Sequence, residues 1–107
     1  MIHGFFISFL PQDQWAIAAA SAYNDWLIDK WLSKDSRYRG TVVVAAQDPK
    51  AAAREIDRVG QHPGMVQVGL SIHSPYRGYG DQFYDPIWEA AVRNNLVVAM
   101  HVSVGIG

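Results

Sequence analysis

Thr41-Val42-Val43-Val44-Ala45-Ala46-Gln47-Asp48-Pro49 joins an apolar run to the start of a helix, and this stretch decides the fold. β-Branched residues dominate the start of Thr41–Ala46, which predicts a buried strand. Asp is a preferred helix N-cap and Pro is tolerated at the first helical position, so we expect a helix from Pro49 to Val59. Gly60 is expected to end this helix. A strand that leads directly into a helix is the repeating unit of an α/β fold.

The same unit recurs in the second half of the chain. Met65–Ile72 predicts a strand, and the pair Asp85-Pro86 predicts the N-cap and first turn of a short helix that ends at Arg93. Asn94-Asn95 would close that helix, because Asn tolerates the left-handed conformation. The continuous apolar run Leu96–Met100 predicts a last, buried strand. We therefore expect two βαβ units with adjacent parallel strands in chain order.

The first third of the chain has a helical pattern. Apolar positions recur at helical spacing from Pro11 to Lys34 and predict a helix whose packing stripe is Trp15, Ala19, Ala22, Trp26 and Leu27. We expect the four tryptophans to pack in the core rather than to form a ligand cage: Trp15, Trp26, Trp31 and Trp88. Met1–Leu10 is apolar, too short to span a bilayer and without the basic start of a secretory signal, so it is expected to be a core strand.

Composition excludes several function classes. The 107 residues suit a single domain, and nine Lys and Arg against ten Asp and Glu leave a net charge of −1. No basic stripe is visible, so we expect neither nucleic acid nor membrane as a partner. The absence of cysteine excludes disulfides, Cys-ligated zinc and a thiol nucleophile. It leaves the redox compartment unconstrained, and the cytoplasm is the default expectation. Glu55, Asp57 and Arg58 are predicted to be a solvated helix face rather than an acid–base pair.

His101 is the first candidate site residue, because it directly follows the apolar run Leu96–Met100. Polar side chains at the carboxyl ends of parallel strands are where α/β folds place their chemistry. The alternative is a strand-end histidine that bonds to backbone. In the loop after the preceding strand, His73, Tyr76 and Arg77 are either substrate contacts or ordinary polar residues.

The following residues stand in the order and spacing of a known family: Asn24-Asp25-Trp26-Leu27, Trp31-Leu32, Asp35, Arg37, Arg39-Gly40, Gln47-Asp48-Pro49, Ala52-Ala53, Glu55-Ile56, Gln67-Val68, Tyr84-Asp85-Pro86-Ile87-Trp88-Glu89-Ala90-Ala91 and His101. Over about residues 15–101 the chain resembles amidohydrolase-related proteins. That group includes aminocarboxymuconate-semialdehyde decarboxylase and lactone hydrolases. The resemblance implies that residues 1–107 are one partial domain, a parallel βαβαβ segment of a (β/α)8 TIM barrel.

The resemblance also implies a divalent metal, usually zinc, at the carboxyl ends of the barrel strands. In the family, a His-x-His pair on the first strand, a His on the fifth and an Asp on the eighth bind this metal, and a His on the sixth is catalytic. Only His101 corresponds to one of these positions, the fifth-strand ligand, with Thr41–Ala46 as third strand and Met65–Ile72 as fourth. No His-x-His occurs, and the last three strands have no counterpart, so the chain resembles a truncated barrel segment.

The family implies metal-dependent hydrolysis of a C–N, C–O or lactone bond in a small molecule, within a complete barrel. Two alternatives stay open: a related decarboxylase, or a non-catalytic α/β module. A catalytic zinc site needs about three protein ligands and an open position for water. One imidazole therefore predicts no tight metal binding and no activity for this chain alone. Two unpaired sheet edges would also favour self-association.

Overall fold

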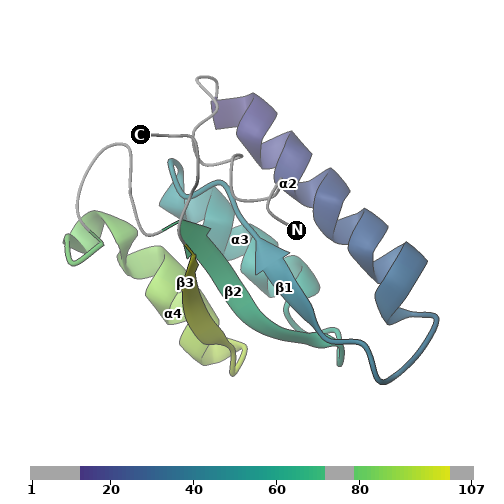
Figure 1. Ribbon diagram of the computed structural model, residues 1–107. Helices are drawn as coiled ribbons and strands as arrows, with labels where there is room; N and C mark the ends of the chain where they lie inside the picture. Colours follow the sequence, from purple (N-terminus) through teal and green to yellow (C-terminus); the bar gives the residue numbers. More distant parts are fainter. Residues whose placement is uncertain (1–12, 72–78, 102–107) are drawn as a thin grey trace.

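The structure is a computed structural model that describes residues 13–71 and 79–101 (Figure 1). Three parallel strands and their crossover helices follow one another along the chain. The elements, in order, are α2 (Asp13–Leu27), the π-helix η2 (Ile28–Leu32), β1 (Gly40–Val43), α3 (Pro49–Val59), β2 (Met65–Ser71), the 3₁₀ turn η3 (Gln82–Tyr84), α4 (Asp85–Arg93) and β3 (Val97–His101). The predicted strand at Met1–Leu10 lies outside the described residues.

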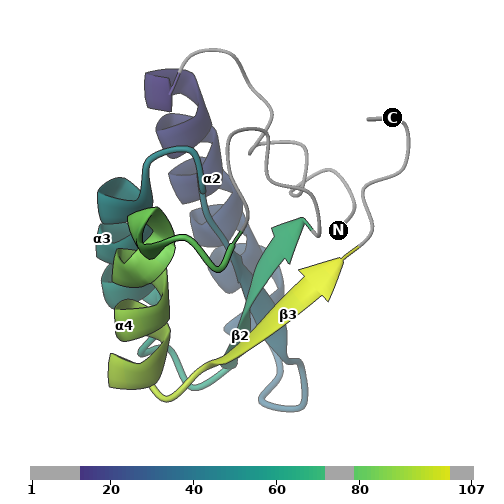
Figure 2. The ribbon, with the colours of Figure 1, turned by 90° about the vertical axis from the view of Figure 1, so that its left-hand side faces the viewer.

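The sheet has the predicted topology. Its order is β1-β2-β3, and both neighbouring pairs are parallel. Val42 is level with Val68, and Gly69 is level with Ala99, so the strands are in register along the middle of the sheet. Figure 2 shows α3 and α4 together on one side of β2 and β3. Both βαβ units are therefore confirmed.

Buried residues form two clusters, because successive side chains of a strand point to opposite faces. Val42 and Val44 of the β1 run belong to the larger cluster, together with Ile56 of α3 and Ile87 of α4. The smaller cluster joins two residues of this run to the start of α2: Ala16, Ala20, Val43 and Ala45. The β1 run is thus buried on both faces, as expected for a strand of a parallel sheet.

The packing stripe predicted for α2 is right at Leu27 and wrong by one or two positions elsewhere. The buried residues of this helix are Ala16, Ala20, Asn24 and Leu27. Trp15 is 70% exposed, Trp26 47% and Trp31 45%, so these three tryptophans are not core residues. Small side chains let the helix approach β1 closely, and the bulky rings one position away face outward. Trp88 does pack against the larger cluster, as predicted.

Asn24 binds the outer edge of β1. Its side chain is fully buried, accepts a hydrogen bond from the Val43 N–H at 2.9 Å and donates to the Val43 carbonyl at 2.8 Å. The carboxamide thus satisfies both backbone polar groups of the last residue of β1. Among the described residues β1 still pairs with β2 alone, as expected for an edge strand, and Asn24 covers this edge at one residue. Within the described part of the chain, β3 keeps a hydrogen-bonded neighbour on one side alone.

Glu55 of α3 is a buried carboxylate, not part of the solvated face that the sequence predicts. It is 8% exposed and accepts hydrogen bonds from Asn24 Nδ2 at 2.8 Å, from Ser21 Oγ at 2.9 Å and from Arg58 Nε at 2.8 Å. Arg58 also bonds to Asp25 of α2 at 2.8 Å. The bond to Glu55 is the main cause that raises the pKa of the Arg58 guanidinium above its ordinary value. This network holds α2 against α3.

The helix termini follow the predicted signals with one exception. The Asp48 side chain accepts a hydrogen bond from the Ala51 N–H at 3.1 Å and caps α3. Asn95 has a φ of 58°, the left-handed conformation predicted after α4. Asp85, however, lies in the first turn of α4 and is not its N-cap. An extra 3₁₀ turn precedes the helix, and the Asp81 side chain caps that turn through the Phe83 N–H at 2.8 Å.

Asp48→Ala should lower the free energy of unfolding by about 1 kcal/mol, the usual cost of a lost N-cap. The reason is that the Ala51 N–H at the start of α3 would lose its side-chain hydrogen-bond acceptor. Urea unfolding followed by circular dichroism measures the difference. Arg54→Ala, an exposed position in the same helix, is the control and should change stability by less than about 0.5 kcal/mol. Equal stability of the two variants would contradict the cap.

Gly60→Ala should destabilise the protein, because there is no space at this position for a methyl group. Gly60 follows α3 with a right-handed φ of −69°, so the left-handed conformation is not the reason for glycine here. A Cβ atom at Gly60 would lie 2.4 Å from the Ile56 carbonyl oxygen and 3.0 Å from Leu96 Cδ1. We expect a loss of about 1–3 kcal/mol in urea unfolding. Gly80→Ala is the matched control, because a Cβ there meets nothing within 4 Å; a loss of the same size in the control would contradict the argument.

Candidate functional site

The carboxyl ends of the strands form the edge where the sequence predicts chemistry. His101 is the last residue of β3, level with Ser71 at the end of β2. The position of His101 at this edge is therefore as predicted. The structure describes its backbone, and its side chain lies outside the description, as do His73, Tyr76 and Arg77 in the segment 72–78.

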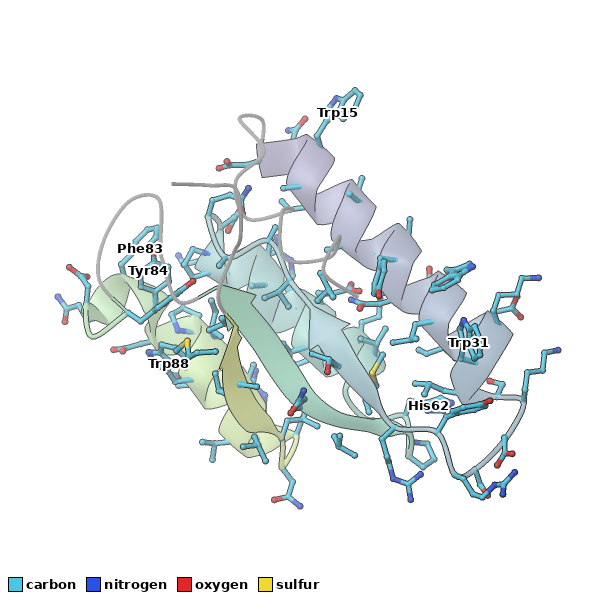
Figure 3. The ribbon with its side chains drawn as sticks, viewed as in Figure 1. Trp15, Trp31, His62, Phe83, Tyr84 and Trp88 are labelled. Atoms are coloured by element: carbon cyan, nitrogen blue, oxygen red, sulfur yellow. The ribbon has the colours of Figure 1, made fainter. Side chains whose placement is uncertain are left out.

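His62 lies at the opposite end of the sheet. It belongs to the turn before β2, and its Nδ1 accepts a hydrogen bond from the Gly64 N–H at 3.0 Å. Figure 3 shows His62 on the side of the molecule where Trp31 lies, far from Phe83 and Tyr84. His62 therefore has a structural role in a turn and is no partner for His101.

Gln47 is a polar residue near the carboxyl edge that the sequence reasoning did not single out. It follows the β1 run and is only 5% exposed. The sequence does indicate its position, because Gln47 stands between the apolar run Thr41–Ala46 and the helix cap Asp48. Its burial, however, depends on packing that the sequence pattern does not show.

An aromatic group also lies where the chain passes from β2 to α4. The Tyr79 ring centroid is 4.9 Å from that of Tyr84 and 6.0 Å from that of Trp88 (Figure 3 shows the latter two rings). Burial, with a smaller contribution from Tyr84, raises the pKa of Tyr79 to about 12. This hydroxyl thus stays protonated at neutral pH. Within the described residues no atom pairs with it.

The described residues do not by themselves form a metal site. Among the side chains that the structure describes, in ranges 13–70 and 79–100, no three His, Cys, Asp or Glu groups lie close enough to hold an ion. A catalytic zinc ion needs about three such ligands. In the same ranges, no helix is both long and apolar enough to cross a bilayer.

Comparison with protein families identifies the chain. The amidohydrolase family model matches residues 8–107. The chain belongs to the amidohydrolase family. This amidohydrolase segment also superposes on 5-carboxyvanillate decarboxylase from Novosphingobium aromaticivorans, solved with manganese and 4-hydroxy-3-methoxy-5-nitrobenzoic acid, with a TM-score of 0.81 and 28% identity. A search of the curated proteins gives no match.

The solved relatives are much longer than this amidohydrolase chain. The match to the decarboxylase covers 94% of this chain and 30% of that protein. A variant of the same enzyme gives a TM-score of 0.79 over 96% of this chain and 31% of its own. A Staphylococcus aureus protein assigned to the amidohydrolases gives 0.73 at 23% identity, over 80% and 28% of the two chains. The parallel βαβαβ unit is thus a segment of an amidohydrolase TIM barrel.

Proposed function

We propose that this amidohydrolase segment belongs to a metal-dependent decarboxylase that acts on a small aromatic carboxylic acid within a complete barrel. The observation that carries the proposal is the match to 5-carboxyvanillate decarboxylase, at 28% identity over 94% of this chain. Hydrolysis is the second candidate, and the description of the matching family model as amidohydrolase favours it. Both reactions would use the same edge of the sheet.

His101 is the residue we assign to the metal. It ends β3, so its backbone lies at the edge where parallel α/β folds place their sites. The metal, when bound, would polarise the substrate and neutralise its negative charge. Zinc is the ion that the family resemblance implies, and manganese is the ion in the decarboxylase relatives. Because the described residues do not complete a site, we expect the remaining ligands to come from a complete barrel.

A chimera tests the proposal. Residues 13–101 would replace the matching segment of the Novosphingobium decarboxylase, and the purified protein would be loaded with manganese or zinc. We expect it to release CO₂ from 5-carboxyvanillate in a metal-dependent manner. The 107-residue chain, assayed in parallel, should show no turnover. A folded, metal-containing chimera without decarboxylation would contradict the proposal, and its hydrolysis of lactone or amide substrates would favour the second candidate.

A further inference from the structure

A pocket lined by aromatic rings lies at the end of α2, next to the start of β1. We call it the aromatic pocket. Its volume is about 430 Å³, and its lining residues are Tyr23, Trp26, Leu27, Trp31, Leu32, Tyr38 and Arg39. A volume of this size falls within the range of small-molecule sites, about 300–1,000 Å³. Because β1 begins here, the pocket is at the opposite end of the sheet from His101.

The π-helix η2 explains why two tryptophans reach this pocket. The Ser33 N–H bonds to the Ile28 carbonyl, five residues back, at 2.9 Å. Such i→i+5 winding brings residues five apart onto nearly the same face, and π-turns are frequent at functional sites. Leu27 and Leu32, five apart, are both buried. Trp26 and Trp31, also five apart, are both about half exposed and line the pocket together.

The rings of the pocket are oriented by contacts with one another. The centroids of Trp31 and Tyr38 are 5.6 Å apart at an interplanar angle of 89°. Those of Tyr23 and Trp26 are 5.8 Å apart at 46°. Such edge-to-face and tilted pairs hold the rings in place, and all four of these rings line the pocket. Figure 3 shows Trp31 at this end of the helix and Trp15 at the other.

Arg39 sets the charge of the ligand. Its Nη1 donates to the backbone carbonyls of Ser36 and Tyr38. No carboxylate among the described residues pairs with it, whereas Arg37 is bound to Asp35 at 2.8 Å. A guanidinium has five N–H donors and matches the geometry of a carboxylate, so Arg39 retains donors for an anion. A pocket lined by aromatic rings alone would favour a cation, but the positive charge of the adjacent Arg39 would repel a cationic ligand.

We propose that the aromatic pocket binds a planar aromatic carboxylate, with its ring against Trp26 and Trp31 and its carboxylate on Arg39. The rings supply the apolar contact and the guanidinium supplies the charge-assisted hydrogen bonds. This site does not depend on the proposed decarboxylase activity, since it uses residues at the other end of the sheet. It is a binding site for which neither His101 nor a metal ion is needed.

Calorimetric titration of the 107-residue chain with 2-naphthoate tests the site. We expect saturable binding of one molecule per chain, and at least about tenfold weaker binding of the neutral analogue 2-naphthylmethanol, which lacks the charge-assisted hydrogen bonds. Arg39→Gln should weaken 2-naphthoate to a similar extent. Trp31→Ala should weaken both compounds. Trp15→Ala, an exposed tryptophan at the far end of the same helix, should leave the affinity unchanged.

Arg39 is exposed, so the Arg39→Gln variant should keep the fold, and circular dichroism would verify this. Equal affinity for the acid and the alcohol would overturn the proposal, because the charge would then play no part. An unchanged affinity in Arg39→Gln, an equal loss in Trp15→Ala, or absence of binding by the folded chain would each overturn it as well.

Discussion

Asn24→Ala should lower the free energy of unfolding by about 3–5 kcal/mol, one of the two largest effects that the structure predicts. The side chain is fully buried and forms hydrogen bonds with the Val43 N–H, the Val43 carbonyl and the Glu55 carboxylate. Alanine would leave the Val43 N–H and carbonyl without this partner, and each unsatisfied buried group costs about 1–3 kcal/mol. Glu55 would lose one hydrogen bond and keep those from Ser21 and Arg58. Urea unfolding followed by far-ultraviolet circular dichroism measures the loss.

Two comparison variants separate this contact from a general effect of truncation. Gln61→Ala removes an amide from an exposed turn and should change stability by less than about 0.5 kcal/mol. Asn24→Asp keeps the acceptor for the Val43 N–H but places a carboxylate oxygen against the Val43 carbonyl and Glu55. This unfavourable contact should be partly relieved as the pH falls and the new carboxyl is protonated. An Asn24→Ala variant as stable as Gln61→Ala would show that the β1 edge does not depend on this side chain.

His101→Ala in the decarboxylase chimera should reduce kcat/KM by at least about 100-fold, since changes even in groups that only support metal ligands cost about 10–100-fold. Loss of a ligand also predicts less than one metal ion per protein after dialysis. His62→Ala is the matched control, because His62 bonds to a turn at the other end of the sheet. That variant should keep its metal content and most of its activity. Equal activity and metal content in both variants would contradict the assignment of His101.

Helix caps and turn residues that are visible in the sequence predicted the elements from α3 to the C-terminal end of α4 well. The helix α3 runs from Pro49 to Val59 as expected, because the side chain of Asp48 caps it from within the same segment. Asn95 takes its left-handed conformation for an equally local reason. An additional 3₁₀ turn precedes helix α4, because Asp81, four residues before Asp85, caps that turn.

The orientation of α2 could not be predicted from periodicity. The stripe with Trp15 and Trp26 and the stripe with Ala16 and Ala20 have the same helical spacing, and only contact with β1 decides between them. The hydrogen bonds of Asn24 are formed between segments nineteen and thirty-one residues apart, for which no local pattern exists. The burial of Glu55 follows from these contacts.

The candidate site was predictable in position but not in composition. His101 ends β3 because an apolar run precedes it, a feature that the sequence displays directly. Within the part of the chain that the structure describes, no three His, Cys, Asp or Glu side chains lie together as a metal site requires. The aromatic pocket could not be predicted from the sequence. It depends on the π-helical hydrogen bonding of η2, and on Tyr38 and Arg39, which follow that helix in the chain and line the same pocket.

A crystal structure of the zinc-loaded chimera, with the metal located by its anomalous scattering, tests the central claim most directly. The claim is that this amidohydrolase segment brings His101 to the metal at the carboxyl edge of its sheet. We predict an imidazole nitrogen of His101 at about 2.0–2.1 Å from the zinc ion. A fully occupied zinc ion at the barrel site with His101 outside its coordination sphere would contradict the claim.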